Sequence, residues 1–148
     1  MATVLIADDD ADHLELMSLA LERIGHTVVR VLDAESARAV LKDGGIDAAL
    51  LDVRMPGESG IDLCRRLREQ PATAFLPIMV ISADVNDQRI RMAMTAGADD
   101  YLEKPFRRGE LCARLDSLLR RRPGVSRPPA AALPSVRKTA ATQRLTVT

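Results

Sequence analysis

The chain has 148 residues, a length typical of one domain, and its hydrophobic (47%) and charged (28%) fractions are those of an ordinary globular protein. The net charge is zero but unevenly placed. Five of the 21 basic residues and none of the 21 acidic residues lie in residues 122–148, so residues 1–121 have a net charge of −5. An acidic globular part argues against nucleic acid as its partner, and we expect none to bind there.

Targeting signals are not predicted. The N-terminal segment MATVLIADDD has no basic residue and only a short apolar run before three aspartates, which does not resemble a signal peptide. No apolar run reaches the length that a membrane span needs. The two cysteines, Cys64 and Cys112, have no metal-binding or redox spacing and are interpreted as small apolar helix residues. The sequence therefore predicts a cytoplasmic protein without membrane contact.

Short apolar runs alternate with amphipathic stretches in residues 1–121. The predicted strands are residues 4–7, 27–31, 48–51, 78–81 and 100–102. Continuous apolar runs are typical of strands buried on both faces of a parallel sheet. Apolar residues at helical spacing follow each strand: Leu14, Met17, Leu21 and Ile24; Ala37, Val40 and Leu41; Ile61, Cys64 and Leu67; Ile90, Ala93 and Met94; and Leu111, Leu115, Leu118 and Leu119. Gly97 is expected to end the fourth helix. The fifth helix leads into Arg120, Arg121 and Arg122, whose positive charges complement the helix dipole. Five βα units predict an α/β fold with helices on both faces of the sheet.

The composition changes at residue 122. Beyond it, four prolines interrupt a stretch rich in Ala, Ser, Thr and Arg that has no helical or strand periodicity: Pro123, Pro128, Pro129 and Pro134. Such a stretch buries too little apolar surface to offset the entropy of ordering it. We therefore predict a globular domain over residues 1–121 and a flexible Pro/Ala/Arg-rich tail or linker over residues 122–148.

Polar side chains follow the predicted strands where the strands end. They are Asp8, Asp9 and Asp10 after the first strand, Asp52 after the third, Ser82 after the fourth and Lys104 after the fifth. Sites in open α/β sheets form at this edge. Loops are polar in general, which would explain any one of these residues alone. Clustered carboxylates, however, repel each other unless a cation neutralises them, so the whole set indicates a site.

The residue types indicate the chemistry. Oxygen ligands alone favour Mg²⁺, or a similar hard ion such as Mn²⁺, over Zn²⁺. Asp52 is the candidate nucleophile, because a carboxylate can form an aspartyl phosphate. Magnesium, the Lys104 ammonium and the Ser82 hydroxyl would then neutralise the phosphoryl oxygens.

Four segments, VLIADDD, LLDVRMPGESGIDLCRRLR, IMVISA and AGADDYLEKPF, resemble the response-regulator receiver family across Thr3 to about Arg121. The resemblance implies a flavodoxin-like sheet of strand order 2-1-3-4-5. It also implies a phosphorylatable switch of two-component signalling, whose donor is a sensor histidine kinase or a histidine phosphotransfer protein. Such a domain catalyses only its own phosphorylation and dephosphorylation and is not otherwise an enzyme.

The resemblance implies a role for each site residue. Asp52 is the phospho-acceptor. Magnesium is held by Asp9 directly, by Asp8 largely through water, by Asp52 and by the backbone carbonyl of Arg54. The side chain of Arg54 is at a position that varies in the family and influences the lifetime of the phosphoryl group. Asp10 is a helix N-cap more than a ligand.

The remaining implied roles concern the switch and its loops. Ser82 is the switch hydroxyl, Tyr101 the switch aromatic and Lys104 the phosphoryl-binding lysine. Loop-shaping residues are Pro56, Gly57 and Pro105, the last after a cis peptide bond. The face that responds is formed by the fourth helix (residues 86–96), the fifth strand and the fifth helix (residues 107–121), and binds a downstream protein or a second copy. His13 and His26 are predicted to be surface residues.

Three functions are compatible with these residues. The first is a stand-alone receiver, and the second is the N-terminal part of a longer regulator with an output domain beyond Thr148. The third is a magnesium-dependent phosphatase with an aspartyl nucleophile. Such phosphatases usually have an Asp-x-Asp motif, and Arg54 occupies its second acidic position here.

Overall fold

The computed structural model describes residues 1–84 and 86–120; Val85, Arg121 and the predicted tail lie outside the described residues. One sheet contains the strands β1 (Thr3–Ala7), β2 (Thr27–Val31), β3 (Ala48–Asp52), β4 (Ile78–Ser82) and β5 (Asp100–Glu103). The helices are α1 (Ala11–Arg23), α2 (Ala34–Lys42), α3 (Gly60–Arg68), α4 (Asp87–Ala96) and α5 (Arg108–Leu119). All neighbouring strands are parallel, in the order β2-β1-β3-β4-β5, so the predicted fold is confirmed.

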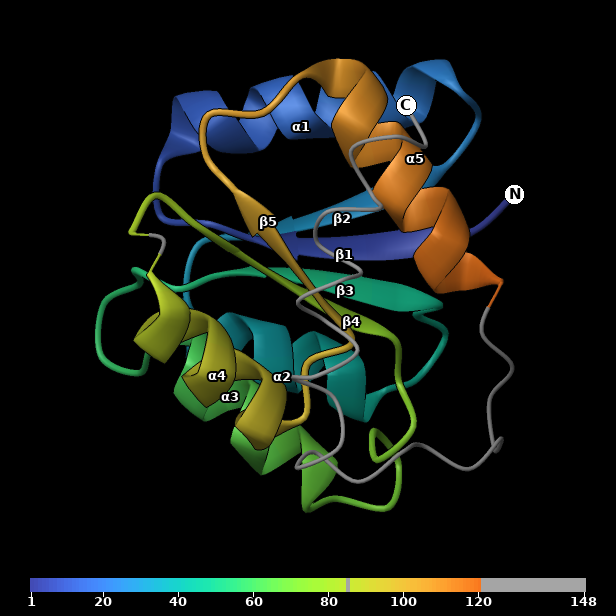
Figure 1. Ribbon diagram of the computed structural model, residues 1–148. Helices are drawn as coiled ribbons and strands as arrows, with labels where there is room; N and C mark the ends of the chain where they lie inside the picture. Colours follow the sequence, from blue (N-terminus) through green and yellow to red (C-terminus); the bar gives the residue numbers. More distant parts are fainter. Residues whose placement is uncertain (85, 121–148) are drawn as a thin grey trace.

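Helices cover both faces of the sheet (Figure 1). Helices α1 and α5 lie on one face, and α2, α3 and α4 lie on the other. Strand β1 shows why its sequence has no polar alternation. Val4 and Ile6 pack into the core under α1 and α5, whereas Leu5 and Ala7 pack into the core under α2 and α3. Both sets of side chains are almost fully buried, as in a central parallel strand.

Short polar side chains begin most of the helices. Asp10 accepts hydrogen bonds from the backbone N–H groups of Asp12 and His13 at the start of α1, which is the N-cap role that the resemblance implies. Ser59 caps α3 in the same way. Helix α4 ends at Gly97, which has a left-handed φ of 110°, in agreement with the predicted stop.

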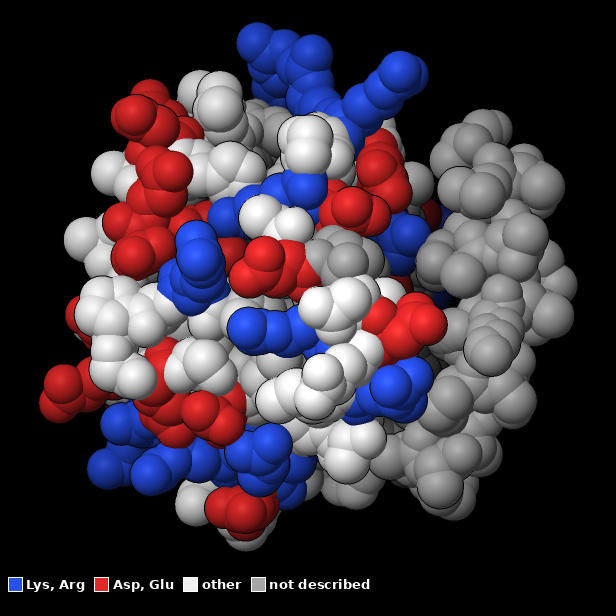
Figure 2. All heavy atoms as spheres, turned by 60° about the vertical axis from the view of Figure 1, so that its left-hand side comes forward, with Lys and Arg blue, Asp and Glu red and all other residues white. Residues whose placement is uncertain are grey.

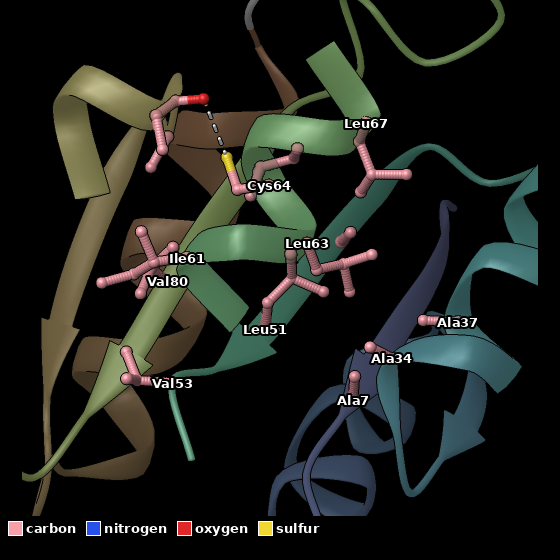
Figure 3. Close-up of a cluster of buried hydrophobic side chains, with 14 of the residues drawn as sticks. Ala7, Ala34, Ala37, Leu51, Val53, Ile61, Leu63, Cys64, Leu67 and Val80 are labelled. Atoms are coloured by element: carbon pink, nitrogen blue, oxygen red, sulfur yellow. Dashed lines mark hydrogen bonds between the residues drawn. The ribbon is translucent and has the colours of Figure 1, made fainter. Parts of the chain in front are cut away.

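Helix α3 packs closely against the sheet and against α4 (Figure 3). Cys64 is fully buried in this layer, and its thiol lies 3.7 Å from the carbonyl oxygen of Ala96. Its buried position on α3 agrees with the prediction of a helix residue in the core. Within the described part of the chain, no helix combines the length and the apolar character that crossing a membrane requires.

Element boundaries differ from the predictions in three places. Ile24 was expected in the buried stripe of α1, but the helix ends at Arg23 and Ile24 is 46% exposed. Helix α5 ends at Leu119 and not within the arginine run, and Arg120 is its C-cap and forms an ion pair with Asp116. Strands β3 and β4 include Asp52 and Ser82 as their last residues. These two side chains are therefore fixed by the sheet.

Candidate functional site

Three carboxylates meet where the strand order reverses. Asp8 and Asp9 follow β1, and Asp52 ends β3, which is paired directly with β1. One oxygen from each of the three side chains lies within 4.8 Å of the other two. Asp8 and Asp52 are buried, whereas Asp9 is exposed at the mouth of the site. The switch point of the sheet therefore carries an all-oxygen cluster open to solvent on one side.

Lys104 provides the positive charge in this cluster. Its ammonium nitrogen lies 3.0 Å from Asp52 Oδ1 and 3.3 Å from Asp8 Oδ2. The backbone also fixes its position, because the Lys104 N–H donates to the carbonyl oxygen of Ser82 at 2.9 Å. The peptide bond between Lys104 and Pro105 is cis. One ammonium is thus shared between two buried carboxylates.

Burial dominates the electrostatics of Asp52. Desolvation raises the pKa of Asp52 above its usual range, the hydrogen bond and charge of Lys104 oppose this rise, and the charges of Asp8 and Asp9 add to it. One lysine does not offset the burial and crowding of these acids. The ionised form of the site would therefore be stabilised by an additional cation.

His13 and His26 are each partly buried, so both are less exposed than predicted, and His13 has a role that the sequence did not indicate. Its side chain is only 25% exposed, and its Nδ1 lies 3.0 Å from Asp8 Oδ2. The ring also packs edge-to-face on Phe106, with the ring centroids 5.6 Å apart. A side chain in the first turn of a helix points back over the preceding loop, which is the sequence signal that could have identified His13.

The loop between β3 and α3 is shaped by glycine. Gly57 has a left-handed φ of 81°. Gly60 was not singled out from the sequence, yet a Cβ atom there would overlap the backbone carbonyl of Asp52. Its N–H donates to the carbonyl oxygen of Val53 at 3.1 Å. Glycine at position 60 therefore lets α3 begin against the end of β3, and its place as the second glycine of PGESG is the signal that could have been used.

Ion pairs connect the same loop to helices α2 and α3. Glu58 forms ion pairs with Arg38 of α2 and with Arg66 of α3, the second at 2.7 Å. Arg54, Pro56 and Gly57 are exposed on this loop.

On the side of the molecule turned forward in Figure 2, acidic and basic side chains are interspersed.

Ser82 and Tyr101 are linked through the β4–α4 loop. Ser82 is 2% exposed, and its hydroxyl oxygen accepts a hydrogen bond from the Asp84 N–H at 3.0 Å. The Tyr101 hydroxyl donates to the Asp84 carbonyl oxygen at 3.1 Å. Burial raises the pKa of Tyr101, and its hydrogen bond with Ser82 opposes the rise. The two residues predicted as a switch thus contact the same loop segment.

The fold and the site together define a class of protein. Its members are doubly wound domains that have an acidic cluster at the switch point of the sheet and a lysine beside a buried aspartate. Residues 4–116 match the family described as "Response regulator receiver domain", and the chain belongs to this family. It is a receiver domain of the kind found in two-component response regulators. The aspartyl phosphatase is accordingly not favoured.

Individual relatives agree with this assignment. The chain is 41% identical over 128 residues to the phosphate regulon transcriptional regulatory protein PhoB of Pseudomonas aeruginosa, covering 86% of this chain and 56% of that protein. Across the curated relatives that it matches, the chain spans about half of their length.

Solved structures show the same fold. Chemotaxis protein CheY4 of Vibrio cholerae superposes with a TM-score of 0.76 at 27% identity, covering 80% of this chain and 98% of that one. The receiver domain of sensor histidine kinase PA1611 of Pseudomonas aeruginosa, solved with magnesium coordinated in its active-site cleft, has a TM-score of 0.74 at 28% identity, covering 80% of this chain and 97% of that one.

Proposed function

We propose that this receiver domain accepts a phosphoryl group on Asp52 with Mg²⁺ bound beside it. The observation that carries the proposal is the placement of the Lys104 ammonium between Asp52 and Asp8, next to the three-carboxylate cluster. Carboxylate oxygens are the ligands that Mg²⁺ and Mn²⁺ prefer. The magnesium in the related receiver of PA1611 supports the same choice of ion.

Asp8, Asp9 and Asp52 would hold the ion, together with the backbone carbonyl of Arg54. Magnesium, when bound, supplies charge neutralisation for the phosphoryl oxygens. An oxygen of Asp52 forms the new bond to phosphorus while the bond from phosphorus to the donor breaks, and the donor leaves with the electron pair of that bond. The Lys104 ammonium, already 3.0 Å from Asp52, turns from the carboxylate to a phosphoryl oxygen. The reaction is self-catalysed in the sense that these residues belong to the acceptor itself.

The donor in this proposal is a sensor histidine kinase or a histidine phosphotransfer protein in the cytoplasm. The response is a rearrangement of Ser82 and Tyr101 that changes the face made by α4, β5 and α5. Within this face, Arg114 of α5 pairs with Asp100 of β5 at 2.8 Å, which connects the helix to the strand. A downstream protein or a second copy of the chain would bind there. A stand-alone receiver and the N-terminal part of a longer regulator would use the same face.

Phosphorylation by a small donor tests the acceptor. The full chain is incubated with acetyl phosphate and Mg²⁺, and its intact mass is measured. We expect one phosphoryl increment in the wild type and in Asp62→Asn, an exposed control on α3, and none in Asp52→Asn or in the wild type with EDTA. A persistent increment in Asp52→Asn would show that another residue is the nucleophile.

The metal is tested separately. Because the chain has no tryptophan, Mg²⁺ binding is followed by calorimetry or NMR. Asp9→Ala should bind Mg²⁺ much more weakly than the wild type, whereas Asp62→Ala should not differ from it. An unchanged affinity in Asp9→Ala would remove Asp9 from the metal site.

A further inference from the structure

His13 is held from two sides beside the acidic cluster. It lies in the first turn of α1, where its backbone N–H donates to Oδ1 of the N-cap Asp10 at 3.2 Å. Its ring packs edge-to-face on Phe106, with an angle of 68° between the ring planes. Phe106 belongs to the loop that follows Lys104. The imidazole therefore connects α1 with the loop that carries the phosphoryl-binding lysine.

The Asp8 carboxylate is fully buried and its oxygens have separate partners. Oδ1 accepts a hydrogen bond from the Asp10 N–H at 2.9 Å. Oδ2 is shared by the Lys104 ammonium at 3.3 Å and by Nδ1 of His13 at 3.0 Å. An ionised carboxylate only accepts hydrogen bonds, so the proton of the imidazole must be on Nδ1 for this contact to be a hydrogen bond. The geometry thus selects the Nδ1–H form of the ring.

We infer that His13 is a positioning residue of the metal site: its Nδ1–H holds Asp8 in the orientation that serves Mg²⁺, and keeps holding it when Lys104 turns to the phosphoryl group. The inference rests on the proposed function. Lys104 serves Asp8 and Asp52 at once, so its move to a phosphoryl oxygen removes a donor from Asp8 Oδ2. A buried oxygen without a donor is unfavourable. His13 is the donor that remains in place, because it is fixed by α1 and Phe106 and not by Asp52.

Two substitutions separate the hydrogen bond from the packing. His13→Leu keeps apolar bulk against Phe106 but has no donor. His13→Asn loses most of the ring but places an amide N–H close to the position of Nδ1. A matched control is His26→Leu, since His26 is also partly buried, but its Nδ1 accepts from the Ala2 N–H away from the acidic cluster.

The readout is Mg²⁺ affinity of the full chain without a phosphoryl donor, measured by calorimetry. We expect His13→Leu to weaken binding by about tenfold, the usual effect of removing a partner of a metal-ligating side chain. His13→Asn should recover most of this loss, and His26→Leu should bind as the wild type does. Equal affinity in His13→Leu and the wild type would overturn the inference. An equal loss in the Leu and Asn variants would assign the effect to packing on Phe106 and would overturn it as well.

A second measurement needs no variant, and so does not depend on how His13→Leu folds. Two-bond ¹H–¹⁵N NMR correlations of the wild type should show the His13 proton on Nδ1, and a ring protonated only on Nε2 would overturn the inference. The proposed function fails on different grounds. Mg²⁺ binding without phosphorylation of Asp52 would contradict the proposed function alone, whereas a wild type that binds no Mg²⁺ would contradict both.

Discussion

The Lys104 ammonium lies 3.0 Å from Asp52 Oδ1, although β4 separates the strands at whose ends these two residues stand. The ion pair therefore crosses the edge of a strand that contributes neither partner. Such a contact is possible because parallel strands end at one edge of the sheet and Lys104 has a long side chain. The acidic cluster and its lysine therefore come from the ends of three strands, β1, β3 and β5.

Removal of the lysine should destabilise the protein without metal. Lys104→Gln takes the cation away from two buried carboxylates, and we expect a loss of about 2 kcal/mol in the free energy of unfolding, as for a hydrogen bond to a charged group. Saturating Mg²⁺ should restore part of this loss, because the ion neutralises the same oxygens. Urea denaturation with EDTA or with Mg²⁺ measures both effects. Lys42→Gln, at the exposed end of α2, is the control, and equal losses in the two variants would contradict the prediction.

Removal of the Asp52 charge should have the opposite effect. Burial holds the pKa of Asp52 above its usual value of 3.8, so the folded state binds this proton more tightly than the unfolded state does. Ionisation of Asp52 therefore costs stability, and the cost develops as the pH rises through the folded pKa. Asp52→Asn carries no such charge. In EDTA it should be more stable than the wild type at pH 7, and the difference should vanish as the pH falls below about 3.8.

Urea denaturation of both proteins at several pH values measures the difference. Each kcal/mol gained would raise the melting temperature by about 4 °C in a domain of this size. Mg²⁺ should reverse the order, since only the wild type retains the full set of carboxylates. If Asp52→Asn is less stable at pH 7 in EDTA, the pairing with Lys104 outweighs the burial of Asp52.

Glycine 60 should tolerate no side chain. In Gly60→Ala the new Cβ would overlap the carbonyl of Asp52, so either α3 or the end of β3 must move. We expect a loss of about 1–3 kcal/mol in stability, as for overpacking of a core, and weaker Mg²⁺ binding because the Asp52 backbone shifts. The control is Gly109→Ala in α5, where a Cβ meets nothing within 4 Å. That change should be neutral or stabilise by up to about 1 kcal/mol, because alanine favours helices. A fully stable Gly60→Ala variant would show that the loop adapts at little cost.

The fold and the acidic cluster could be predicted because they depend on local patterns and on the rule for strand ends. Residues 48–51 and 78–81 are continuous apolar runs, and a central parallel strand buries both faces. Once these strands are assigned, Asp8, Asp9 and Asp52 must share one edge. This part of the site follows from the topology.

His13 and Gly60 were not predicted, because their roles depend on tertiary contacts that the patterns of strands and helices do not show. Phe106, which is distant in the sequence, packs against the His13 ring, and Gly60 is constrained because the loop before it folds back onto Asp52. The prediction for Ile24 was wrong for a local reason. Helical spacing does not determine the residue at which a helix ends, and α1 ends at Arg23.

Phosphorylation should be communicated from Ser82 to Tyr101. The Ser82 hydroxyl and the Tyr101 hydroxyl contact the backbone of the same residue, Asp84, at 3.0 Å and 3.1 Å. A phosphoryl group on Asp52 offers strong acceptors to the Ser82 hydroxyl, and a hydroxyl that turns toward them weakens its contact with Asp84. The β4–α4 loop is then released, and with it the partner of Tyr101. A few kcal/mol of differential affinity is enough to shift such an equilibrium.

NMR with beryllofluoride, a mimic of the phosphoryl group, tests this route. In the wild type we expect chemical-shift changes around Asp52 that extend to Tyr101 and to α4. In Ser82→Ala the changes should remain around Asp52 and fail to reach Tyr101, because alanine has no hydroxyl to move. Ser117→Ala, at an exposed position of α5, should behave as the wild type does. Changes that stay near Asp52 even in the wild type would make the domain a phosphoryl acceptor without a switch, and a role as a phosphate sink would then fit better than signalling through the α4–β5–α5 face.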